Sequence, residues 1–157
     1  MAYDTTAPVQ HPLTAIFNIA DPVETNYKNL EALLAQFTPN ALNAVGTVHF
    51  ARFIFMDYNS NGVASRVAII TTFDGDWMTY IQDFVNVISD FFNALLACVE
   101  GGAACIPVEK NTVAFGQFVL RWNNPPSTSQ DPNVLVDPPV WYSAYPTKTV
   151  KTINGPE

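Results

Sequence analysis

The chain carries little charge. Only 13% of its 157 residues are charged, about half of the roughly 25% that is usual in globular proteins. Fourteen acidic residues against seven basic ones give a net charge of −7, and the basic residues form no cluster. A surface that binds nucleic acid needs clustered Lys and Arg to neutralise phosphates. The composition therefore argues against nucleic acid as a partner.

The sequence also lacks long apolar runs and is poor in cysteine. No apolar run approaches the about 20 residues that span a bilayer, so we expect no membrane span. The N-terminal segment has neither the basic nor the apolar region of a secretory signal. The two cysteines, Cys98 and Cys105, are too few for a disulfide scaffold. We expect a cytoplasmic protein, although the Asn-rich, Lys-poor composition leaves an extracellular location open.

Hydrophobic residues are abundant, at 48% of the chain, and 13% of residues are aromatic, which excludes a disordered chain. Its length indicates a single core. We predict a flexible N-terminal arm over residues 1–12, a folded domain over 13–122, and a tail over 123–157 that packs on the domain. The tail is proline-rich, since seven of the twelve prolines lie in the last 33 residues.

The hydrophobic spacing predicts both helices and strands. Apolar residues three and four apart predict one helix that begins at Pro22 and another that begins at Trp77. Alternating or β-rich runs predict four strands, over residues 13–20, 46–58, 63–73 and 112–122. The order β-α-β-β-α-β predicts an α+β, ferredoxin-like fold. In it, a four-stranded antiparallel sheet carries two helices on one face.

A hairpin is the strongest local signal. Asn61-Gly62 lies between two of the predicted strands and is typical of a two-residue turn. This turn makes the numbers of facing residues sum to 123, so that Asp57 faces Arg66 and His49 faces Asp74. Both faces of this hairpin are apolar, and a second copy should cover the face that carries no helix. We therefore expect a homodimer, with two sheets closing into a dimeric α+β barrel, or a larger homo-oligomer.

Four short motifs resemble those of a known group of bacterial proteins. They are TVHFARF over 47–53, TTFDGDW over 71–77, YIQDF over 80–84 and YSAYP over 142–146. The chain is similar, over most of residues 12–153, to members of the dimeric α+β-barrel superfamily. That superfamily includes cofactor-free monooxygenases, EthD-like proteins, chlorite dismutases and dye-decolorising peroxidases, and the last two bind haem.

The resemblance extends to one segment of the dye-decolorising peroxidases. Phe73-Asp74-Gly75 resembles the end of their Gly-x-x-Asp-Gly segment, whose Asp lies on the distal side of the haem, while Thr71 replaces the first Gly. The resemblance implies that the protein binds either haem or no cofactor. It also implies oxidoreductase chemistry of the peroxidase or monooxygenase kind.

His49 and Asp74 are the first candidates for a site. His49 is the one histidine inside a predicted element, and a facing carboxylate orients an imidazole as a base or makes it a better metal ligand. The alternative is a purely structural hydrogen bond. Arg52, in the middle of a strand, would bind an anionic group of a ligand or a haem propionate, or else a structural partner such as Asp83. No three residues have the spacing of a zinc site, so we predict no metal site.

A pocket for a flat ligand would draw on aromatic side chains and one hydroxyl. We predict that its residues are Phe53, Phe55, Thr72, Trp122, Trp141 and Tyr142. The alternative is that these aromatics belong to the core or hold the tail in place. Asp76 has a sufficient explanation as a helix cap, and we assign it no catalytic role.

Three functions follow from these observations. The first is a dimeric protein that binds a small hydrophobic or aromatic ligand through His49, Asp74 and Arg52 and acts as an oxidoreductase. The second is a haem-binding, peroxidase-like protein that uses the same residues. The third is a non-catalytic, self-assembling structural subunit. The sequence leaves open whether the protein is an enzyme.

Overall fold

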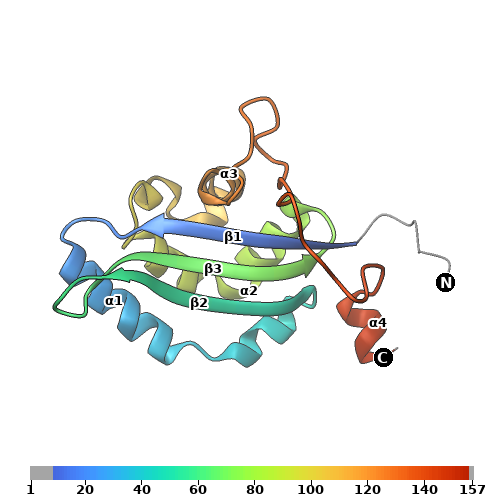
Figure 1. Ribbon diagram of the computed structural model, residues 1–157, viewed down its shortest axis with the longest axis horizontal. Coiled ribbons are helices and arrows are strands. Elements are labelled where there is room, and N and C mark those ends of the chain that lie inside the picture. Colours follow the sequence, from blue (N-terminus) through green and yellow to red (C-terminus); the bar gives the residue numbers. More distant parts are fainter. Residues whose placement is uncertain (1–8, 156–157) are drawn as a thin grey trace.

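The computed structural model describes residues 9–155. Three strands lie side by side with β3 in the middle, and the helices pack against them (Figure 1). The strands are β1 (Gln10–Asn18), β2 (Val48–Tyr58) and β3 (Ala64–Asp74). The helices are α1 (Val23–Gln36), α2 (Trp77–Leu96), α3 (Thr112–Trp122) and α4 (Val150–Asn154), with short 3-10 helices η1 (Pro39–Ala44), η2 (Gly102–Cys105) and η3 (Val108–Lys110).

The chain is an α+β fold, but the predicted fourth strand is wrong. Residues 112–122 form helix α3, so the antiparallel sheet has three strands in the order β1-β3-β2 and three main helices. The buried residues Phe115, Phe118 and Val119 are spaced as on a helix, whereas Val113, which a strand would place beside Phe115, is 54% exposed. Packing of α3 against the body therefore overrides the β propensity of Val, Phe and Thr.

A fourth strand would pair with the outer edge of β1. In its place, this edge makes a single isolated β-bridge, between Ala15 and Asn123. Asn123 accepts a hydrogen bond from the Thr14 N–H at 2.9 Å, and the Asn124 N–H donates to the Thr14 carbonyl at 2.9 Å. Pro12 lies on the same strand and has no N–H to pair. The edge is thus short of free donors, which discourages pairing with another chain.

The β2–β3 hairpin is present, but its register differs from the prediction by one residue. The Asn59 N–H donates to the Val63 carbonyl, so the loop has three residues, and only Gly62 in it has a positive φ, +74°. A two-residue turn of the expected type would need positive φ at Asn61 as well. The numbers of facing residues consequently sum to 122 over most of the hairpin, as for Phe53 and Ile69.

This shift decides which side chains share a face. Ala51, Phe53 and Phe55 of β2 now lie on the helix-covered face with the buried Val67 and Ile69. With the predicted sum of 123, Val67 and Ile69 would instead share a face with Phe50. The predicted ion pair between Asp57 and Arg66 is nevertheless present, although Met56 is the direct partner of Arg66.

The core lies between the sheet and helices α2 and α3. Its largest fully buried side chains include Phe17, Phe73, Tyr80 and Phe115, and Phe73 stacks on Tyr80 with ring centroids 3.9 Å apart. Asp76 caps α2 as predicted and accepts hydrogen bonds from the Thr79 N–H at 3.0 Å and the Thr79 hydroxyl at 2.7 Å. These hydrogen bonds hold the pKa of the Asp76 carboxyl below its ordinary value. The aromatic side chains along the apolar stripe of α2 pack in this core.

The opposite face of the sheet carries Phe50, Arg52, Ile54 and Met56 from β2. Phe50 is 77% exposed, and Arg52 is exposed too. The homodimer, the barrel closure and the structural subunit remain predictions, and this face is the surface they would use. None of the described helices is long and apolar enough to cross a membrane.

The predicted arm lies largely outside the described residues. Residues 1–8 are not described, and β1 begins at Gln10, so residues 10–12 belong to the sheet. The tail runs from Asn123 across one end of β1 to α4 (Figure 1). Leu135 in this tail packs against the core.

Paired substitutions in α3 distinguish the helix from the predicted strand. Phe115→Ala should lower the free energy of unfolding by about 3–5 kcal/mol, because it empties a buried aromatic site. Val113→Ala should change it by less than about 0.5 kcal/mol, because that side chain is largely exposed. Urea unfolding measures both, and equal losses would indicate that residues 113 and 115 share one face as in a strand.

Candidate functional site

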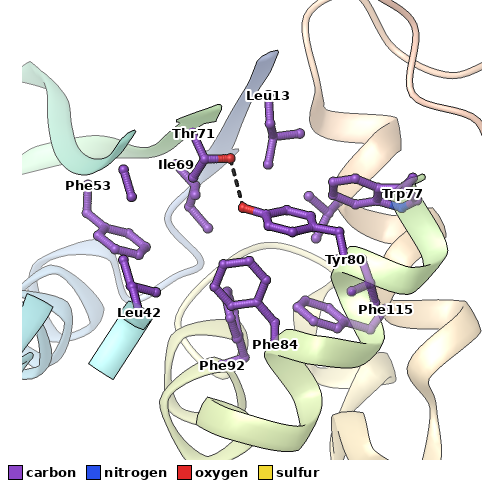
Figure 2. Close-up of a pocket in the computed structure, with 13 residues that line it drawn as sticks. Leu13, Leu42, Phe53, Ile69, Thr71, Trp77, Tyr80, Phe84, Phe92 and Phe115 are labelled. Atoms are coloured by element: carbon purple, nitrogen blue, oxygen red, sulfur yellow. Dashed lines mark hydrogen bonds between the residues drawn. The ribbon is translucent and has the colours of Figure 1, made fainter. Parts of the chain in front are cut away.

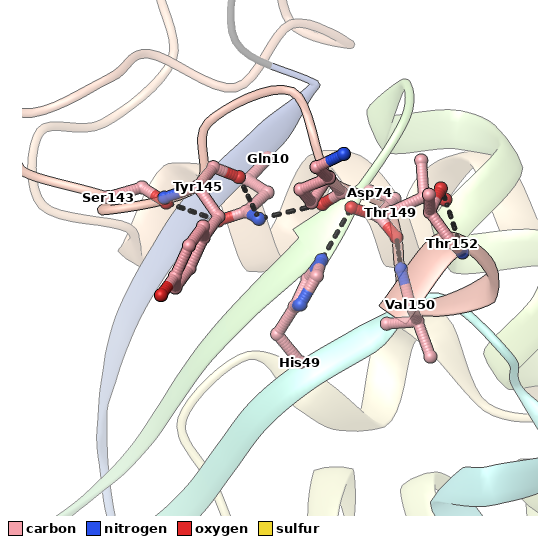
Figure 3. Close-up of polar contacts among 9 residues, drawn as sticks. Gln10, His49, Asp74, Ser143, Tyr145, Thr149, Val150 and Thr152 are labelled. Atoms are coloured by element: carbon pink, nitrogen blue, oxygen red, sulfur yellow. Dashed lines mark hydrogen bonds and ion pairs between the residues drawn. The ribbon is translucent and has the colours of Figure 1, made fainter. Parts of the chain in front are cut away.

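The start of β2 and the end of β3 bring His49 and Asp74 together. A β-bulge lies between Val48 and Phe50, and such an irregularity redirects a side chain relative to the regular pleat. His49 Nε2 lies 2.6 Å from Asp74 Oδ1 (Figure 3). The two side chains are only 6% and 9% exposed. The predicted contact is present, although the register that predicted it is shifted along most of the hairpin.

The hydrogen bonds of Asp74 assign the tautomer of the neutral His49 ring. An ionised carboxylate only accepts hydrogen bonds, so Nε2 carries the hydrogen and donates it to Asp74 Oδ1. Nδ1 then presents a lone pair, and it makes no hydrogen bond to any of the described residues. The second carboxylate oxygen, Oδ2, accepts the Val150 N–H at 2.7 Å. Asp74 is thus held at both oxygens and fixes the orientation of the ring.

A groove of about 1010 Å³ opens beside His49, between η1, the start of β2 and helix α4. This volume is in the range of small-molecule sites. Its lining, drawn from the described part of the chain, includes Lys151 and three asparagines but no aspartate or glutamate. The lining residues are Pro39, Asn40, Leu42, Asn43, Gly46, Val48, His49, Ala51, Val150, Lys151, Asn154 and Gly155.

The tail forms one wall of the groove because polar groups on the sheet hold it. The Gln10 amide donates to the Tyr145 carbonyl at 2.9 Å and to the Lys148 carbonyl at 2.8 Å (Figure 3). The Ser143 hydroxyl donates to the Gln10 amide oxygen at 2.8 Å. Gln10 is only 5% exposed, so these bonds satisfy a buried amide. Gln10 and Asp74 together fix α4 against the sheet.

A second cavity lies in the interior, between the sheet and helices α2 and α3 (Figure 2). It has a volume of about 20 Å³, which holds about one water molecule. The Tyr80 hydroxyl lies 2.9 Å from the Thr71 hydroxyl at its wall, and burial raises the pKa of Tyr80 well above its ordinary value. Leu13, Leu42, Ala51, Phe53, Ile69, Thr71, Trp77, Tyr80, Ile81, Phe84, Phe92, Phe115 and Val119 line it.

Of the predicted site residues, only His49 and Asp74 meet. Arg52 is exposed on the opposite face of the sheet, makes no ion pair among the described residues, and is absent from the groove lining. Phe53 lines the interior cavity, and its ring also contacts the Phe91 ring, with centroids 5.3 Å apart. Phe55 packs on Tyr27, with ring centroids 4.9 Å apart.

The other predicted ligand contacts are dispersed. Thr72 faces Phe50 across the β2–β3 ladder, and Trp122 packs on Phe17 with ring centroids 6.3 Å apart. Trp141 and Tyr142 belong to the tail, where Tyr142 is 86% exposed. These side chains do not form one pocket with His49.

Sequence reasoning missed several residues of the groove. Val150 and Lys151 belong to a short helix within the predicted tail, and Gln10, which holds this tail without lining the groove, lies in the predicted arm. Leu42 belongs to η1, a segment for which the sequence analysis predicts no element. The one available signal was the polar, proline-containing stretch 38–43, which is typical of a surface turn.

The cysteines and possible metal ligands form no further site. Cys98 and Cys105 are buried and free, and burial raises the pKa of each thiol. Within residues 9–155, no three His, Cys, Asp or Glu side chains are grouped so that they could hold a metal ion.

Comparison of the chain with protein-family models, curated proteins and solved structures finds no significant match. The resemblance to the dimeric α+β-barrel superfamily therefore stays a prediction.

The bond between Val150 and Asp74 can be removed without breaking α4. Val150→Pro deletes the N–H at the first helical position, where proline is tolerated, and the extended Thr149 before it suits a proline. A hydrogen bond to a charged group contributes about 1.5–3 kcal/mol, so the Thr152 and Ile153 amides should exchange on the order of tenfold faster or more.

Hydrogen exchange followed by NMR measures this effect. Val150→Ala, which keeps the N–H, is the matched control and should leave the exchange rates within about twofold, the effect of a small surface change. Equal acceleration in both variants would show that the Val150 side chain, rather than its N–H, holds the tail.

Proposed function

We propose that the chain binds a small molecule with a hydroxyl group in the groove, where His49 Nδ1 accepts the hydroxyl hydrogen and Asp74 is the positioning residue. The single observation that supports this function is the 2.6 Å contact between His49 Nε2 and Asp74 Oδ1 at the edge of the groove. A histidine that donates from one nitrogen to a carboxylate is oriented to act as a base through the other.

The surroundings of the pair agree with this role. Lys151 is among the described residues that line the groove, and its ammonium group would stabilise negative charge as the hydroxyl loses its proton. The three asparagine side chains offer donors and acceptors for further polar groups of the ligand. The groove thus supports binding and proton abstraction, and oxidoreductase activity stays a prediction that needs a substrate.

Haem is the second candidate and has less support. The His49–Asp74 pair suits an axial ligand that binds iron through Nδ1, because metal-bound histidines often donate their other nitrogen to a carboxylate. Arg52, predicted to hold a propionate, is not among the groove residues, and none of the described residues lining the groove is Phe, Tyr or Trp. Added haemin should give no Soret band that depends on His49, and such a band would favour haem over the hydroxyl ligand.

Phenol is the probe for the proposed site, since it is a neutral donor near pH 7. Loss of one hydrogen bond of about 1.4 kcal/mol corresponds to a tenfold change in affinity, so His49→Ala should weaken phenol binding about tenfold or more. The control is His11→Ala, which removes the other histidine of the chain. NMR titration of both variants, with melting curves to verify folding, measures the effect, and equal affinities would overturn the proposal.

The positioning role of Asp74 has a separate readout. In ¹⁵N NMR of the histidine side chain, Nε2 of His49 should appear protonated and Nδ1 unprotonated. Asp74→Ala removes the acceptor and should return the ring to a mixture of tautomers, with weaker phenol binding. An unchanged tautomer in Asp74→Ala would show that the carboxylate does not orient the ring.

A further inference from the structure

The groove and the interior cavity share part of their walls. Leu42 and Ala51 line both of them, with the polar groove and His49 on one side and the aromatic cavity on the other. Resting on the proposed function, we infer that the ligand is amphipathic. Its hydroxyl end lies at His49, and its apolar end passes between Leu42 and Ala51 into the aromatic cavity.

The chemistry of the two spaces sets this orientation. The interior cavity is walled by apolar and aromatic side chains, and its polar pair, Tyr80 and Thr71, already bond to each other. A polar end there would leave its hydrogen bonds unmade, which is costly in a buried site. The groove, in contrast, has the polar residues His49 and Lys151 in its lining. Only the apolar end of a ligand therefore suits the interior.

The proposed passage between Leu42 and Ala51 is short, and the Leu42 side of it is the less firmly packed one. Ala51 follows His49 by two residues on β2, which places it about 7 Å further along the strand. An aromatic ring with a short para substituent bridges this span. Leu42 belongs to η1, in which no residue is buried and no side chain caps the N-terminus, whereas Phe84, Phe92 and Phe115 on the far wall are buried.

Leu42 is consequently the side chain whose movement enlarges the cavity. The present volume of about 20 Å³ accommodates about a methyl-sized group, so a longer substituent must displace a wall. Local opening occurs where few buried apolar contacts hold a segment, and η1 is such a segment. The expected ligand class is therefore a phenol-like molecule with a short apolar para substituent.

A homologous series of probes tests this inference: phenol, 4-methylphenol, 4-ethylphenol and 4-propylphenol. Each methylene that enters the cavity should tighten binding about fourfold, until the cavity is full. Leu42→Ala should strengthen the binding of 4-propylphenol relative to phenol. Leu42→Trp should abolish the dependence on chain length, since the larger side chain blocks the passage.

Leu33→Ala is the matched control, because Leu33 is a half-buried leucine of α1 that contacts the core and lines neither space. It should keep the native chain-length dependence. Nuclear Overhauser contacts between the ethyl group of 4-ethylphenol and the rings of Tyr80 and Phe84 provide a measurement in the native chain that requires no variant. Their presence supports the inference, and contacts of the ethyl group only with tail residues overturn it.

The outcomes separate this inference from the proposed function. If the phenols bind in a His49-dependent way with equal affinities along the series, the groove site stands and the passage into the cavity is refuted. A chain-length dependence that survives in Leu42→Trp also refutes the passage. If no member of the series binds, or binding is independent of His49, both proposals fail together.

Discussion

The carboxylate of Asp74 is the group on which the candidate site depends. It is nearly buried, and burying a charge is costly unless hydrogen bonds replace the lost water. His49 Nε2 and the Val150 N–H supply these bonds, one to each oxygen, at 2.6 and 2.7 Å. One carboxylate thus fixes an imidazole, the end of a central strand and the last helix of the chain at the same time.

This arrangement explains why the site forms between distant parts of the sequence. The groove has walls from η1, from the start of β2 and from α4, and neither β2 nor α4 alone makes a concave surface. Gln10, at the first position of β1, also holds the tail, because its side-chain amide donates hydrogen bonds to two carbonyls of the tail, those of Tyr145 and Lys148. The polar ends of the strands therefore act as anchors for a tail that has little regular structure of its own.

The interior cavity is apolar except for one pair of hydroxyl groups, whereas the groove is polar. The Tyr80 hydroxyl donates to the Thr71 hydroxyl, and most of the other lining side chains are apolar or aromatic, so the cavity offers few polar groups to a ligand. A ligand that used both spaces would find its hydrogen-bond partners only in the groove and its apolar contacts only behind Leu42. The two spaces would then recognise the two ends of one molecule by different physical means.

The sequence by itself determined the local elements whose signals are short-range. The apolar stripe that begins at Trp77, the cap at Asp76 and the β2–β3 hairpin follow from spacing and turn chemistry. The meeting of His49 and Asp74 could be predicted because both residues lie at the open end of that hairpin. Tertiary structure decided the rest. Packing made residues 112–122 a helix, one positive φ in place of two shifted the hairpin register by one residue, and buried hydrogen bonds of Gln10 and Asp74 brought the tail to His49. The helix at 112–122 and the position of the tail depend on contacts between residues far apart in the chain, which no local pattern of side chains encodes.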